Sequence, residues 1–159
     1  MRRPRQGLRC GARTRKLRGT SGAAPAWSER NFRDALAAGY SARVGVRGDR
    51  IVAYGVLMLG PGEAQLLNLS VVPEARRMGL GRTLLKQFVD DARRLYADQL
   101  FLEVRVTNRA AIALYEAAGF TSIARRVAYY PPSHPGGTRE DALVMRCALN
   151  GMPGTPATK

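Results

Sequence analysis

The spacing of apolar residues changes several times along the chain, and each spacing predicts one kind of element. The segment 28–39 begins with Ser28, a favourable helix N-cap, and its apolar residues then recur at helical intervals, so it predicts a short helix. Residues 40–46 and 50–59 alternate apolar and polar positions on either side of a Gly-Asp turn. This alternation predicts a β-hairpin.

The middle of the chain predicts a buried strand followed by an amphipathic helix. Residues 64–72 are apolar enough for a central strand, and Pro73 ends it. A Gly-Leu-Gly turn then leads into residues 82–96, where the apolar side chains follow a helical stripe. The predicted stripe consists of Leu84, Leu85, Phe88, Val89, Ala92 and Leu95.

The last third of the chain predicts a strand at 100–106, a helix at 108–118 with Asn108 as N-cap, and two closing strands at 120–130 and 141–148. The predicted order is therefore α-β-β-β-α-β-α-β-β. Such an order is typical of an α/β protein in which helices flank a mixed sheet.

Composition narrows the class of protein without changing this fold. A chain of 159 residues with 45% hydrophobic residues fits one packed domain. No apolar run reaches the length of a membrane-spanning helix, and the basic first twenty residues are unlike a secretory leader. Cys10 and Cys147 form neither a disulfide framework nor a metal-ligand pattern, so we expect a cytoplasmic protein with no metal.

The net charge of +14 is concentrated at one end of the chain. Residues 1–24 hold eight Lys and Arg and no acid, whereas residues 25–149 hold seventeen against twelve acids. We therefore predict a disordered basic tail at 1–24, a domain at 25–149 and a disordered tail at 150–159. The basic tail has three open explanations: a solvated extension, a misplaced start site, or an organelle transit peptide.

A glycine-rich turn between the predicted central strand and the helix after it is the first chemical signal. Unpaired amides and the positive end of a helix converge at such a turn, which is a geometry that binds phosphate. The alternative is a tight strand-to-helix connection with no ligand. The spacing matches neither a P-loop nor a dinucleotide-binding fingerprint. The turn consists of Arg76, Arg77, Met78, Gly79, Leu80, Gly81 and Arg82.

This turn and three patterns after it resemble the acetyl-CoA motifs of the GNAT N-acetyltransferases. The four are Arg-x-x-Gly-x-Gly at residues 76–81, Asn108, Ala-Leu-Tyr-Glu at 113–116 and Gly-Phe at 119–120. The resemblance extends from about Trp27 to Leu149. Several further segments are similar to bacterial members that acetylate the N-terminal alanine of a small-subunit ribosomal protein. They are residues 27–29, 68–71, 102–105, 129–131 and 139–142.

The resemblance implies the GNAT fold, acetyl-CoA as co-substrate and a role for each matching residue. Glu103 would be the general base and Tyr115 the acid that protonates the leaving thiolate. Asn108 would bind the pantetheine arm, which would also pair with the backbone of the strand containing Leu69, Ser70 and Val71. Each residue also has a plain structural explanation: an ion-paired strand residue near Arg105 for Glu103, an N-cap for Asn108 and a core aromatic for Tyr115.

The resemblance also implies an acceptor. Tyr129, Tyr130, Glu140 and Asp141 match the segment that lines the peptide groove of N-terminal acetyltransferases, and the two acids would attract a basic terminus; an exposed loop is the alternative. An α-amine is deprotonated at neutral pH a few hundredfold more often than a lysine side chain, roughly the difference expected from their pKa values. This favours a ribosomal or other protein N-terminus as acceptor.

Two alternatives and one departure remain open. A lysine side chain or a small amine could replace the α-amine as acceptor, or the chain could be a non-catalytic basic module that binds ribosome or RNA. The basic tail lacks interleaved aromatic residues, so we expect only non-specific nucleic-acid contacts and no membrane partner. The family begins with a strand and a helix that residues 1–24 do not resemble, so the first strand is missing or replaced.

Overall fold

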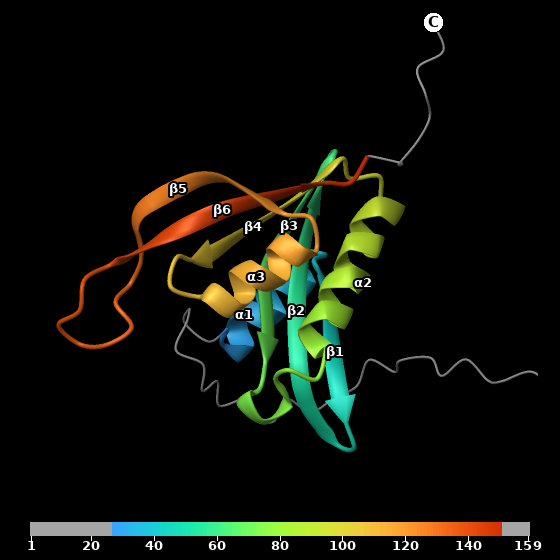
Figure 1. Ribbon diagram of the computed structural model, residues 1–159. Coiled ribbons are helices and arrows are strands. Elements are labelled where there is room, and N and C mark those ends of the chain that lie inside the picture. Colours follow the sequence, from blue (N-terminus) through green and yellow to red (C-terminus); the bar gives the residue numbers. More distant parts are fainter. Residues whose placement is uncertain (1–26, 151–159) are drawn as a thin grey trace, which may run out of the picture.

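The computed structural model describes residues 27–150, which form a mixed sheet with helices on both faces (Figure 1). The predicted tail at 1–24 and all but the first residue of 150–159 lie outside this range. The predicted element order is confirmed, with one short 3-10 turn added. The elements are α1 (Glu29–Ala37), β1 (Ser41–Arg47), β2 (Arg50–Gly60), β3 (Glu63–Val71), η1 (Pro73–Ala75), α2 (Leu80–Arg94), β4 (Gln99–Arg105), α3 (Arg109–Ala117), β5 (Thr121–Tyr130) and β6 (Glu140–Ala148).

The strands lie in the order β1-β2-β3-β4-β6-β5. The strand predicted to be central, β3, is inside the sheet, and it is parallel to β4 while the other neighbours are antiparallel. Among the described residues the first element is α1, and β1 is an edge strand. None of the helices at residues 27–150 is long and apolar enough to cross a membrane.

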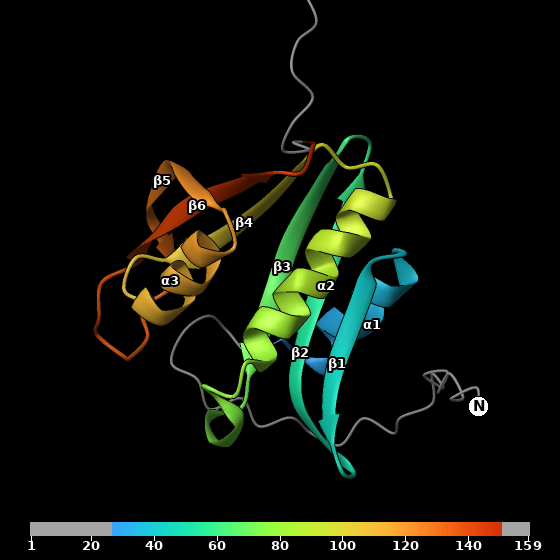
Figure 2. The same cartoon turned by 45° about the vertical axis from the view of Figure 1, so that its right-hand side comes forward.

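Helix α1 is fixed at its start by local contacts. Ser28 and Asn31 form a reciprocal capping box. The Trp27 and Phe32 rings, which flank this cap, lie 5.2 Å apart, and Phe32 is 5.2 Å from Tyr54 of β2. These aromatic contacts place α1 on the face of the sheet opposite α2 and α3 (Figure 2).

Helix α2 buries its apolar stripe against the other face. Phe88 is fully buried and crosses β2 at Gly55, where a Cβ atom would come within 2.5 Å of the Phe88 ring. Leu95, predicted on this stripe, is instead 59% exposed, because α2 starts and ends two residues earlier than predicted and Leu95 lies beyond its end. The confirmed stripe residues are Leu84, Leu85, Phe88, Val89 and Ala92.

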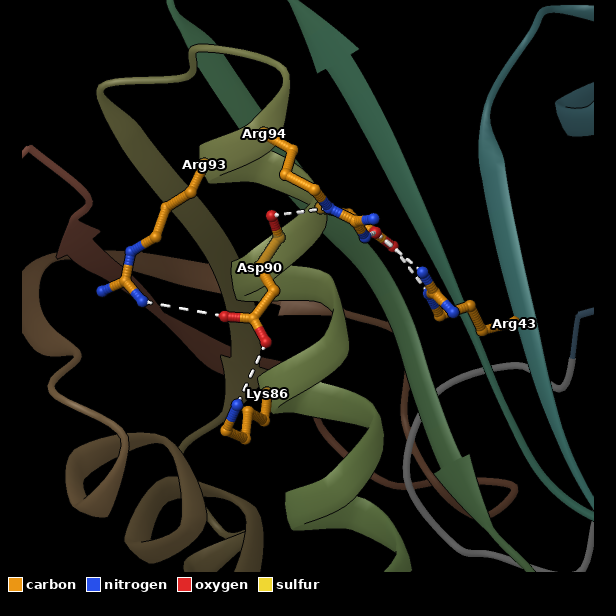
Figure 3. Close-up of polar contacts among 6 residues, drawn as sticks. Arg43, Lys86, Asp90, Arg93 and Arg94 are labelled. Carbon is orange, nitrogen blue, oxygen red and sulfur yellow. Dashed lines mark hydrogen bonds and ion pairs between the residues drawn. The ribbon is translucent and has the colours of Figure 1, made fainter. Parts of the chain in front are cut away.

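An ion-pair cluster joins α2 to the edge strand β1 (Figure 3). Arg43 of β1 donates two hydrogen bonds, at 2.6 and 2.7 Å, to the carboxylate of Asp91, which is one of two buried charged residues in the described chain. Arg94 also contacts Asp91, while Lys86 pairs with the more exposed Asp90 at 3.1 Å. The two-pronged contact from Arg43 holds β1 against the helix.

Candidate active site

The sheet opens between its two parallel strands. β3 and β4 pair only from Glu63–Gln99 to Leu66–Leu102, and their remaining residues diverge (Figure 1). The divergence leaves a cleft of about 90 Å³. The residues that line it are Leu66, Leu67, Asn68, Leu69, Ser70, Glu103, Val104, Arg105, Asn108, Tyr115 and Tyr130. The cleft therefore brings together residues from four elements that the sequence assigned to one site.

The glycine-rich turn follows the open end of β3 and begins α2. Arg76 donates from Nε to the Val71 carbonyl at 3.2 Å, which ties the turn to the diverging strand. Gly79, the N-cap of α2, has φ +79°, and a Cβ atom there would meet nothing within 4 Å. The space beside Gly79, at the start of α2, is therefore open, and Arg77 and Arg82 near it are exposed.

Glu103 projects from β4 beneath the end of β5. Its side chain is 16% exposed, and one carboxylate oxygen lies 3.0 Å from Nε of Arg126. The Tyr129 hydroxyl also hydrogen-bonds to Glu103, and this bond raises the pKa of Tyr129. The ion pair considered as the structural alternative for Glu103 therefore exists, and its partner is Arg126, whereas the nearby Arg105 pairs with Glu140.

A second cavity, of about 310 Å³, adjoins the same carboxylate. Glu103 lines both this cavity and the cleft, so it lies where the two meet. Arg126 lies at this cavity, where its side chain is 55% exposed, so it can swing into solvent at little cost. The lining residues are Met58, Gly60, Glu63, Ala64, Gln65, Phe101, Leu102, Glu103, Arg126 and Val144.

Helix α3 supplies two residues to the cleft. Asn108 caps the helix by accepting the Ala111 amide at 3.3 Å, so the N-cap prediction is confirmed, and the same residue lines the cleft. Tyr115 lies two turns further along and is 7% exposed, with its ring 5.8 Å from Phe120. Burial, with a smaller contribution from Tyr130, raises the pKa of Tyr115 to about 12. Its hydroxyl is therefore protonated at neutral pH.

The two tyrosines at the end of β5 point toward different partners. Their rings meet edge to face at 5.1 Å. Tyr129 contacts Glu103 and lies 5.1 Å from the Arg126 guanidinium. Tyr130 lines the cleft, where burial and then the charge of Glu103 raise its pKa to about 12.

A bulge in β5 produces this arrangement. The register with β6 shifts between Arg126 and Tyr130, and Ala128 has φ +50°. Asp141 accepts the Ala128 amide at 2.8 Å, while Arg139 donates to the carbonyls of Ala128 and Tyr129 at 2.6 Å. The bulge re-aims the strand so that Arg126 and Tyr129 meet the same carboxylate.

Both acids predicted to bind a peptide make internal contacts. Asp141 holds the bulge and pairs with Arg125 at 2.6 Å. Glu140 accepts the Thr107 amide at 3.0 Å and pairs with Arg105 at 2.9 Å. The backbone bond from Ala128 lowers the pKa of Asp141, and the hydroxyl bond from Thr107 does the same for Glu140. Their carboxylates are therefore engaged within the protein rather than free at its surface.

No group of metal-ligand side chains large enough to hold an ion occurs at residues 27–150. Cys147 is a free thiol 6% exposed, and burial raises its pKa. It faces the side of the sheet covered by α2 and α3, near Gly119, and it lines neither the cleft nor the adjoining cavity.

Comparisons with known proteins give a consistent pattern. The acetyltransferase (GNAT) family pattern matches residues 14–120. The [ribosomal protein bS18]-alanine N-acetyltransferase of Escherichia coli (strain K12) is 37% identical over 124 residues, which are 78% of this chain and 82% of that protein.

Two solved structures resemble the fold described above. The crystal structure of the ribosomal-protein-S18-alanine N-acetyltransferase from Escherichia coli superposes with a TM-score of 0.72 at 36% identity over 86% of each chain. Chaetomium thermophilum Naa20, solved in complex with a bisubstrate analogue, gives a TM-score of 0.70 at 27% identity, with 80% of this chain and 76% of that chain covered.

Proposed function

Because the chain belongs to the acetyltransferase (GNAT) family, whose members use acetyl-CoA, we propose that it transfers an acetyl group to the N-terminal α-amine of a protein. The observation that carries the proposal is the position of Glu103, which lines both the cleft and the adjoining cavity. The similarity to the bS18-alanine N-acetyltransferase favours the N-terminal alanine of a small-subunit ribosomal protein as acceptor.

The described residues fit acetyl-CoA. The open space before α2 offers backbone amides to its phosphates, and the freed edge of β3 offers main-chain groups to its pantetheine arm. We propose Leu69, Ser70 and Val71 for the arm, with Asn108 beside them. For the phosphates we propose the turn of Arg76, Arg77, Met78, Gly79, Leu80, Gly81 and Arg82. Acetyl-CoA supplies an acetyl group already activated as a thioester.

In the proposed reaction the acceptor nitrogen forms a bond to the acetyl carbon and the carbon–sulfur bond breaks. Glu103 takes the proton that the amine loses, directly or through water. A main-chain amide of β3 stabilises the negative charge on the carbonyl oxygen. Tyr115 holds its proton at neutral pH and donates it toward the departing thiolate. Transfer of the proton from Glu103 to Tyr115 through water then restores both residues, so protons and electrons balance without a covalent enzyme intermediate.

Tyr129 and Tyr130 border the approach to Glu103, and we propose that they hold the first peptide bond of the acceptor. Glu103 pairs with Arg126 in this structure. An incoming ammonium group would therefore take the place of the Arg126 guanidinium beside this carboxylate. We assign the reaction to the cytoplasm, because protein N-termini emerge from ribosomes there.

Mass spectrometry of acetyl transfer tests this function. The panel consists of peptides that differ only in the first residue, the same peptides with a blocked N-terminus and an internal lysine, and small amines. We expect acetylation of free α-amines, with an alanine-first peptide among the best acceptors. Acetylation of the blocked lysine peptides at equal or greater rates would assign the chain to side-chain acetylation instead.

A further inference from the structure

Arg105 occupies an unusual place beside the proposed site. It is the last residue of β4 and lies two positions after Glu103, so both side chains belong to the same face of the strand. Arg105 is 5% exposed and is the one buried cation in the described chain. Pro131 of the β5–β6 connection and Glu140, the first residue of β6, contact it.

The Arg105 guanidinium contacts three groups that come later in the chain. Nη1 donates to Glu140 at 2.9 Å, and both Nη atoms donate to the Pro131 carbonyl at 3.2 Å. Its carbon Cζ lies 4.5 Å from the centre of the Tyr130 ring. Thr107 braces the other oxygen of Glu140 through its amide at 3.0 Å. One side chain therefore fixes the start of the β5–β6 connection and one of the two cleft tyrosines.

Stability alone does not account for this arrangement. A buried ion pair gains little over well-packed apolar residues, because both charges lose their hydration. Nε of Arg105 is buried and has no hydrogen-bond partner, which adds a further cost. Unlike an apolar residue, arginine offers a planar group with hydrogen-bond donors in fixed directions and a flat face for an aromatic ring.

We propose that Arg105, braced by Glu140, is the positioning residue that fixes Tyr130 and Pro131 at the cleft and thereby sets affinity for the acceptor. The proposal rests on the proposed function, since Tyr130 is there assigned to the acceptor. The contacts of the Arg105 side chain described above do not include the glycine-rich turn, so we expect it to affect the acceptor more than the phosphates of acetyl-CoA. Lysine at this position keeps the charge but contacts Glu140 as a point charge, without the planar group and its flat face.

The test compares Arg105→Lys with Arg43→Lys. Arg43 of the edge strand β1 also pairs with a carboxylate, that of Asp91, through two hydrogen bonds (Figure 3), so its variant controls for loss of an arginine–carboxylate pair. We expect Arg105→Lys to raise the acceptor KM by about 10- to 100-fold, the effect of a small displacement in a binding group. Acetyl-CoA affinity should change by less than about twofold, and Arg43→Lys should alter neither constant.

Two further measurements separate positioning from general damage. In a Tyr130→Ala background, Arg105→Lys should add nothing to the acceptor KM, because the residue through which it acts is absent. The proposal would be overturned if the two substitutions raised the acceptor KM multiplicatively in the double variant. It would also be overturned if a folded Arg105→Lys protein had an unchanged acceptor KM. If Arg105→Lys does not fold, Glu140→Gln takes its place, because it weakens the brace and leaves the arginine.

A readout without turnover keeps this inference distinct from the proposed function. The ring signal of Tyr130 in an NMR spectrum, assigned with Tyr130→Phe, should shift in Arg105→Lys and stay unchanged in Arg43→Lys. An unshifted signal refutes positioning whatever the acceptor is. If the wild-type protein acetylates no α-amine and the signal shifts, the assigned function fails while the positioning role stands.

Discussion

Individual side chains carry the proposed chemistry, and Glu103 is the proposed general base. It must accept a proton while Arg126 and Tyr129 compete for its oxygens. When no acceptor is bound, these two partners stabilise the charge of a carboxylate that is largely shielded from water.

Replacing Glu103 by Gln preserves its shape and removes the base. We expect turnover to fall by about 10² to 10⁴, the usual contribution of general-base catalysis, with acetyl-CoA affinity nearly unchanged. Steady-state kinetics and calorimetry measure the two quantities. Glu116→Gln, at an exposed position of α3, is the control for loss of one negative charge. Near-normal turnover in the Glu103 variant would exclude this residue as the base.

Tyr115 gives a prediction about pH. Its pKa is raised to about 12, so the hydroxyl keeps its proton as pH rises through the ordinary tyrosine value of 10.0. Tyr115→Phe should therefore lower kcat by about 10² or more, the usual effect of losing a general acid. This factor should stay constant between pH 7 and pH 10.5. Rate profiles of both proteins over that range check it. A factor that shrinks toward 1 above pH 10 would show that Tyr115 ionises there.

At the scale of elements, the glycine-rich turn joins strand β3 to helix α2 through a left-handed backbone at Gly79. An alanine there carries a strain of about 1–2 kcal/mol and places a methyl group in the open space before the helix. Gly81 is different, because a Cβ atom would only reach ordinary contact with Leu114, at 3.4 Å.

We expect Gly79→Ala to weaken acetyl-CoA binding beyond its effect on stability, and Gly81→Glu to abolish binding. Gly136→Ala is a matched control, since Gly136 also has φ +79° with nothing within 4 Å, but lies in the β5–β6 connection. Calorimetry with acetyl-CoA and thermal unfolding of the three variants separate the two effects. Equal affinity losses in the Gly79 and Gly136 variants would mean that strain alone is responsible.

The elements were predictable from sequence because their signals are local. Ser28, Pro73 and Asn108 mark boundaries through their own backbone chemistry, and each boundary is confirmed within two residues. The roles given to Asn108 and Tyr115 came from the family resemblance, and both residues line the cleft.

Pairings between distant residues were not predictable in this way. Alternation along a strand shows which side a residue faces, but not which acid an arginine meets. The Glu103–Arg126 contact depends on the strand order and on the bulge at Ala128, and neither leaves a periodic signal. Arg43 and Asp91 are likewise 48 positions apart.

For the whole molecule, every residue assigned to the proposed site lies between Leu69 and Tyr130, inside the described range. A protein that lacks residues 1–24 should therefore retain turnover on a peptide within a few fold. Kinetics of the shortened and full chains, together with circular dichroism of both, measure this. A folded, inactive shortened protein would place part of the site in the basic segment.

The separation of β3 from β4 also affects how resistant the protein is to proteolysis. Beyond Leu66 and Leu102 no strand of the described chain joins these two edges, and a backbone group inside a sheet needs some partner. In the proposed complex acetyl-CoA or spent CoA would supply one, and ligand at 100 times its Kd stabilises the folded state by about 2.7 kcal/mol. Digestion by thermolysin should slow in proportion when either compound is added. A cell short of these metabolites would then degrade the enzyme faster, so its abundance would follow the supply of its own donor.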